Sequence, residues 1–183
     1  MPPTFRAAAV ATATAAIASA LTGCIAMSPS AEDAADGSLV WSVNTTADRL
    51  EKLAWEKPPG KVSPEDITGS LVGQFIALTP QDQDDLIATE GGQSRTVYAM
   101  VSDRNRTEVS AFFLAGGTNG LGGLMATHAQ RYGCATIRYD YVTRAIDITD
   151  DTCPAWIQGD RDSSELSVIT EVIPSHPEAT PDR

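Results

Sequence analysis

The sequence predicts a single small α+β domain with a mainly antiparallel sheet, two or three helices and one disulfide. Three observations predict this class. Segments with helical spacing of apolar residues alternate with short β-rich runs, in the order α-β-α-β-β-α-β-β-β. Two cysteines, Cys134 and Cys153, are placed to close a hairpin. The chain has 183 residues, of which 42% are hydrophobic and 20% charged, as expected for one globular domain with tails.

The first 23 residues have the layout of a signal peptide. Residues 1–6 carry one positive charge, and residues 7–21 form an uncharged run rich in Ala and Thr. This run is too short and too weakly apolar for a transmembrane helix, which needs about 20 strongly apolar residues. We therefore predict that residues 1–23 are removed.

The run ends in Leu21-Thr22-Gly23-Cys24, which resembles the lipobox of bacterial prolipoproteins. The resemblance implies diacylglycerol on the Cys24 thiol and cleavage before this residue. It also implies anchoring at the extracytoplasmic face of the cell membrane through acyl chains such as palmitate, since two chains on one residue hold a protein stably. The alternative is an ordinary secretory signal cut after Ala18-Ser19-Ala20, which would leave Cys24 as a free thiol.

The segments around the domain differ from it in composition. Residues 24–38, rich in Ala, Ser, Asp and Glu, are expected to be a flexible lipidated tether. Residues 174–183 contain three prolines and are expected to be a disordered tail. The globular domain is then predicted to span residues 39–173.

Three helix starts are expected in the first half of the domain. Thr45 opens an apolar stripe that Pro58-Pro59-Gly60 ends, which predicts a helix over residues 45–57. Ser63 can cap one further turn. Thr79, followed by Pro and an acid in the first turn, predicts a short helix to Glu90.

Two hairpins are expected in the sheet. Residues 71–78 form an apolar run of strand length, and strands over 96–101 and 109–115 flank a polar turn at 103–106. The second hairpin pairs residues 134–142 with 145–153, so that Cys134 lies opposite Cys153 and Asp140 opposite Asp147. An even pair of cysteines in an oxidising compartment favours a disulfide. The alternative, a redox-active dithiol, lacks the C-x-x-C spacing. Residues 166–173 are a last β-rich run.

A glycine-rich stretch over residues 116–123 precedes a predicted helix over residues 124–132, which Gly133 would end. A strand, such a loop and a helix N-terminus can present backbone N–H groups to an anion, which makes Gly117, Asn119 and Gly120 candidates for ligand binding. The spacing matches no phosphate-binding motif. The alternative is a flexible loop whose glycines let a helix pack close to the sheet.

The candidates for catalysis are His128, on the apolar stripe of that helix, and a carboxylate such as Asp140 as an acid/base pair. Neither H-E-x-x-H nor G-x-S-x-G occurs. Carboxylates cluster around the second hairpin, but without the EF-hand pattern, so no metal and no cofactor is predicted. Trp41, Trp55 and Trp156 are spread along the chain and are expected in the core or at its rim.

The charge restricts the partners. Loss of the signal removes Arg6 alone, so the formal charge of −11 becomes −12, which argues against nucleic acid. We expect a lipoprotein whose domain binds an envelope protein or a small ligand without catalysis, or alternatively a small envelope enzyme that uses His128. An enzyme would show a pocket in which His128 and a carboxylate converge, whereas a binding domain would show an exposed apolar patch or an open sheet edge.

Overall fold

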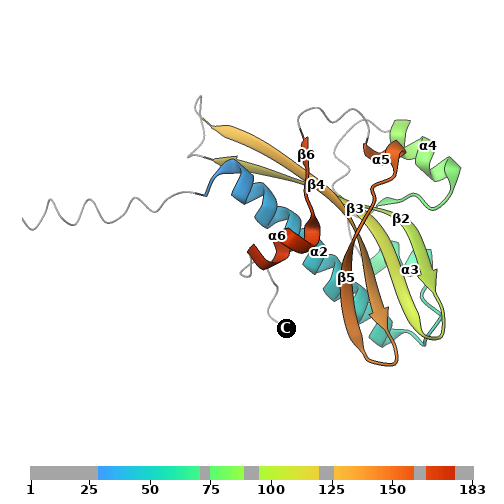
Figure 1. Ribbon diagram of the computed structural model, residues 1–183. Coiled ribbons are helices and arrows are strands. Elements are labelled where there is room, and N and C mark those ends of the chain that lie inside the picture. Colours follow the sequence, from blue (N-terminus) through green and yellow to red (C-terminus); the bar gives the residue numbers. More distant parts are fainter. Residues whose placement is uncertain (1–28, 71–74, 89–94, 120–125, 159–163, 176–183) are drawn as a thin grey trace, which may run out of the picture.

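The computed structural model describes residues 29–70, 75–88, 95–119, 126–158 and 164–175. One long helix packs against a curved sheet, and short helices lie around the sheet (Figure 1). The elements are α2 (Ala31–Glu56), α3 (Pro64–Ser70), β1 (Phe75–Ile76), α4 (Pro80–Ala88), β2 (Arg95–Ser102), β3 (Arg106–Asn119), β4 (Thr127–Asp140), β5 (Ala145–Asp151), α5 (Ala155–Gln158), β6 (Ser164–Leu166) and α6 (Ile169–Ser175).

The sheet has the order β1-β2-β3-β4-β5. The short strand β6 also pairs with β4, at residues before those that pair with β5. The pairs from β2 to β5 are antiparallel, whereas β1–β2 and β4–β6 are parallel. The predicted α+β domain with one disulfide is confirmed, with a mixed, mainly antiparallel sheet. The described residues contain five helices, more than the two or three predicted, because α5 and α6 are too short to give a periodic pattern.

Helix α2 begins well before the predicted Thr45. Ser30 and Asp33 form a capping box, in which the Asp33 amide donates to the Ser30 hydroxyl at 3.0 Å and the Ser30 amide donates to the Asp33 carboxylate at 3.2 Å. Ala35 and Leu39 on its next turns are fully buried. The predicted flexible tether is therefore wrong for residues 31–38, since alanine favours helix and this face has a sheet to pack against.

The main core lies between α2 and one face of the sheet. Its buried residues come from both layers and include Leu39, Val43 and Leu50 of α2 and Val109 and Phe113 of β3. They recur every three or four positions on the helix and every two on the strand, the spacing that places a set of side chains on one face.

The predicted caps of the two short helices are confirmed. Ser63 Oγ accepts from the Asp66 amide at 3.4 Å before α3, and Thr79 Oγ1 accepts from the Asp82 amide at 3.2 Å before α4. The hairpin of β2 and β3 around the turn at 103–106 is also confirmed. Of the strand predicted over 71–78, residues 75–76 form β1, and residues 71–74 lie outside the described part.

The helix predicted over residues 124–132 is wrong. Strand β3 continues through Gly116 and Gly117 to Asn119, and β4 begins at Thr127, so that both strands pair along their whole length. His128 consequently lies on a strand, and Gly133 is a buried strand residue rather than a helix cap. The apolar spacing that suggested a helix is overridden by pairing with a strand that is distant in sequence.

The hairpin of β4 and β5 is confirmed with its disulfide, Cys134–Cys153. The predicted register is wrong by two residues, because Cys134 lies opposite Asp151. A four-residue turn over 141–144 replaces the predicted two-residue turn. The Asp140 carboxylate accepts hydrogen bonds from the amides of Val142 and Thr143, each at 2.8 Å, and so stabilises the longer turn.

This shift also removes the unfavourable pair of carboxylates predicted across the hairpin. Asp147 faces Arg138 rather than Asp140, and the Arg138 guanidinium donates to the Asp147 carboxylate at 2.9 Å. Because the ion pair is largely exposed, it adds little to the free energy of unfolding. Its main effect is to favour this register of β4 and β5 over the predicted one.

The C-terminal run predicted as β over residues 166–173 is a strand only at its start, since β6 ends at Leu166 and α6 begins at Ile169. Asp150 of β5 accepts from the amide and hydroxyl of Thr170 at the start of α6. Residues 174–175 of the predicted tail belong to α6, and residues 176–183 lie outside the described part.

Candidate functional site

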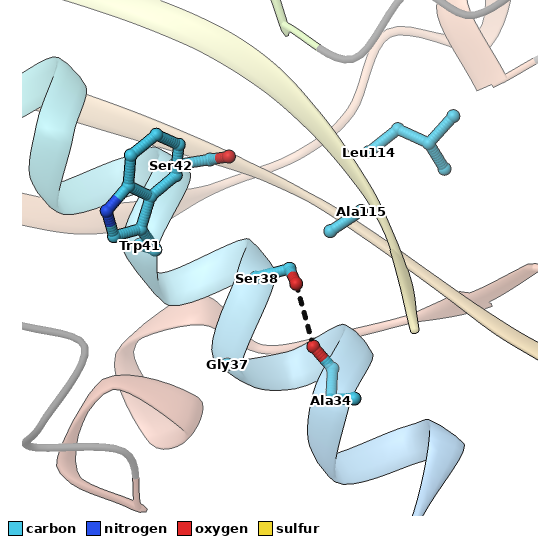
Figure 2. A pocket seen from close by; sticks show the side chains of 7 residues that line it. All are labelled: Ala34, Gly37, Ser38, Trp41, Ser42, Leu114 and Ala115. Atoms are coloured by element: carbon cyan, nitrogen blue, oxygen red, sulfur yellow. Dashed lines mark hydrogen bonds between the residues drawn. The ribbon is translucent and has the colours of Figure 1, made fainter. Parts of the chain in front are cut away.

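An open groove with a volume of about 540 Å³ lies between α2 and β3 (Figure 2). Helix α2 forms one wall and the edge of the strand forms the other. The residues that line it are Ala34, Gly37, Ser38, Trp41 and Ser42 from α2 and Leu114 and Ala115 from β3.

The strand wall exists because β3 is longer than β2. The two strands pair only as far as Arg95 and Phe113, whereas β3 continues to Asn119 with β4 on its other side. Among the described strands, none pairs with this outer edge of β3 from Leu114 onward. Its outward backbone N–H and C=O groups are the kind of edge to which another strand can bind.

The helix wall is made of small residues and one large aromatic ring. Ser38 donates its hydroxyl to the Ala34 carbonyl at 2.8 Å (Figure 2), so this polar group is satisfied within the helix. Trp41 is 53% exposed and stands on the helix above the groove. No ionisable side chain is among the lining residues. The groove can therefore bind apolar or uncharged groups, but it supplies no acid or base.

A hydrogen-bonded polar cluster lies on the opposite face of the sheet. Asp151 accepts from the Tyr98 hydroxyl at 2.8 Å and from Thr136 at 3.1 Å, and Thr136 lies 2.7 Å from Ser110. Burial opposes ionisation of Asp151, but the hydrogen bonds led by Tyr98 outweigh it and lower its pKa. Burial and this carboxylate together raise the pKa of Tyr98. Both groups are held in one protonation state near neutral pH, as in a structural network.

The two predicted catalytic residues are not brought together. His128 is exposed near the start of β4, and Asp140 is the last residue of the same strand. They are twelve positions apart along one extended strand, a distance of about 40 Å. The amides of Thr143 and then Val142 lower the pKa of Asp140, which accounts for this carboxylate as a turn cap.

The predicted anion loop is likewise not formed by its described members. Gly117 lies under α2, where a Cβ would come 2.1 Å from the Ala31 carbonyl oxygen and 2.3 Å from the Ala35 amide nitrogen. Asn119 is the last residue of β3, and Gly120 lies outside the described residues. Gly117 does let a helix pack close to the sheet, as the alternative interpretation expected, but it does so from within strand β3 and not from a flexible loop.

The acidic residues around β5 have partners within the protein. Asp147 pairs with Arg138, Asp150 accepts from Thr170, and Asp151 accepts from Tyr98. Within the described ranges, no three His, Cys, Asp or Glu side chains come together as metal ligands would.

Sequence reasoning missed the groove residues Trp41 and Leu114. The available signal was that Trp41 lies off the apolar stripe of Leu39 and Val43, so a helix there would expose it. Trp55 is also exposed, whereas Trp156 packs against a small cluster around the disulfide.

Cys24 lies outside the described residues. Among the helices of the described part, none combines the length and apolar character needed to cross a membrane. Comparison with protein-family models, curated proteins and solved structures gives no match for this chain.

Proposed function

We propose that the protein is anchored at the extracytoplasmic face of the cell membrane by lipid on Cys24, and that its domain is a non-catalytic binding module of the cell envelope. The lipobox-like sequence before Cys24 supports the anchor. Helix α2 begins at Ala31, so the seven Cα–Cα steps from Cys24 to Ala31 span at most about 25 Å. The groove, which lies on the first half of α2, is then close to the membrane surface.

The partner we propose is an extended, uncharged segment of an envelope protein. The observation that carries this proposal is that an open strand edge adjoins an apolar groove. A strand added to β3 would gain backbone hydrogen bonds, and every second side chain would enter the groove beside Trp41. The absence of charge among the lining residues favours an uncharged segment.

The anchor is tested by the intact mass of the membrane-extracted protein. We expect the mass of residues 24–183 plus acyl groups. In a Cys24→Ser variant, the protein should leave the membrane fraction. A mass without lipid, or one that retains residues 1–23, would contradict the anchor.

The groove is tested with a photoreactive phenylalanine analogue at Ser38, compared with the same analogue at Thr143 on the exposed β4–β5 turn. In membranes, we expect an adduct at Ser38 only, linked to a peptide whose bonded residue lies in an extended segment. The Trp41→Ala variant should abolish it. Equal labelling at Thr143, or an adduct that survives Trp41→Ala, would refute binding in this groove.

A further inference from the structure

A second cavity lies farther along the same flank of α2 and differs from the groove in charge. Its volume is about 250 Å³. The residues that line it are Arg49, Lys52, Leu53 and Glu56 of α2 and Ser70 at the end of α3. Two cations thus meet at one small cavity in a chain whose formal charge is −11.

Arg49 is the unusual member of this set. Its Nη1 atom is buried without a hydrogen-bond partner, and no ion pair to Arg49 occurs among the described residues. A buried charge is normally paired, because desolvation of an unpaired guanidinium is costly. An unsatisfied group of this kind indicates a missing ligand, ion or water.

Another arginine, Arg131, shows that the chain has carboxylates available to pair such groups. This residue of β4 forms ion pairs with Glu32, Asp36 and Glu165. Within the described ranges Arg49 has no carboxylate partner of this kind, although the sequence contains 24 Asp and Glu residues. Glu56, the one carboxylate that lines the cavity, is exposed and forms no ion pair with Arg49.

Arg95 adds positive charge next to Arg49. It lies partly buried at the start of β2. Its pKa is lowered by burial and, to a smaller extent, by the charge of Arg49. An anion bound to Arg49 would weaken this effect on Arg95.

We propose that Arg49, with Lys52, binds a phosphate group at this cavity. A guanidinium group binds phosphate through two parallel hydrogen bonds, and Lys52 adds a second cation. The same phosphate chemistry could belong to free phosphate or to a phosphate monoester at the end of a lipid. The proposal rests on Arg49 and its cavity, and it holds whether or not the groove near Trp41 binds a peptide.

The test is calorimetric titration of the full-length protein in detergent with inorganic phosphate at low ionic strength. Variants Arg49→Gln and Arg104→Gln are compared, because Arg104 is an exposed arginine on the β2–β3 turn. We expect binding to weaken roughly ten-fold or more in Arg49→Gln and to be unchanged in Arg104→Gln. No binding to the wild-type protein, or equal loss in both variants, overturns the proposal.

Thermal unfolding separates a ligand site from a structural role. If Arg49 is held for a ligand, Arg49→Gln keeps or raises the Tm without phosphate and loses the increase in Tm that phosphate causes. A Tm that falls without phosphate, with the phosphate effect retained, would make Arg49 structural and overturn the proposal. Short-chain phosphatidate, compared with inorganic phosphate, then distinguishes the source: tighter binding of phosphatidate assigns a lipid headgroup, and equal or weaker binding assigns a soluble phosphate.

Discussion

At the level of single residues, the contact between α2 and β3 depends on a position without a side chain. Gly117 lies where the helix backbone passes directly over the strand, and a Cβ there would meet the backbone at Ala31 and Ala35. Neither the helix nor the strand can yield locally, because both are hydrogen-bonded along their length. The neighbouring Gly116 points to the other face, where a Cβ would meet nothing closer than 3.9 Å.

These two glycines give a matched pair of variants. Gly117→Ala should lower the free energy of unfolding by about 1–3 kcal/mol, the usual cost of overpacking a filled interface. Gly116→Ala should change it by less than about 0.5 kcal/mol. Urea denaturation of both variants measures the difference. Equal stability of the two would mean that α2 does not pack as closely on β3 as described.

Residue chemistry made some features predictable and left others hidden. The caps at Ser63 and Thr79 were predictable, since each depends on one side chain and its neighbours in the sequence. The disulfide was predictable from an even pair of cysteines in a chain expected in an oxidising compartment. The role of Gly117 was not, because a glycine run has the same composition in a loop and in a strand. Only the pairing of β3 with β4 decides between them, and this pairing is tertiary.

At the level of elements, the start of α2 decides what lies beside the open edge of β3. The segment 31–38 has the composition of a tether, but Ala31 and Ala35 are buried where α2 packs on the sheet. It also supplies Glu32 and Asp36, which form ion pairs with Arg131 of β4 at 3.9 and 3.3 Å. The groove was not predictable from the sequence, because it requires two features that were not predicted. Helix α2 has to begin at Ala31, and strand β3 has to extend beyond the end of β2.

We therefore expect the first two turns of α2 to be part of the folding unit. A chain that begins at Leu39, the predicted start of the domain, should be less stable than one that begins at Pro29. The difference should be roughly 2 kcal/mol or more, because loss of the capping box alone costs about 1 kcal/mol and Arg131 loses two of its carboxylates. Thermal and urea unfolding of the two chains measure this. Identical stabilities would mean that residues 31–38 do not contribute to the fold and act as a tether.

For the whole molecule, the sheet has a different layer on each face. The main core fills the side covered by α2, whereas the other side has a small cluster of Phe112, Cys134, Cys153 and Ile157 under α5. Such a cluster buries little apolar area, so the position of α5 depends on the covalent bond more than on packing. The architecture thus combines a layer held by hydrophobic burial with one held by the disulfide.

Removal of the Cys134–Cys153 bond should affect these two layers differently. The bond closes a loop with a sequence separation of 19, so its loss should lower the free energy of unfolding by about 3 kcal/mol on the chain-entropy model. Below the unfolding transition, hydrogen exchange should accelerate first in α5, while the amides of α2 and β3 stay protected, because their core does not contain the bond. The measurement is urea unfolding and hydrogen exchange of the protein with and without reductant. The Cys134→Ala/Cys153→Ala variant serves as the control, which reductant should leave unchanged. Uniform loss of protection in α2 and α5 would show instead that the two layers form one cooperative unit.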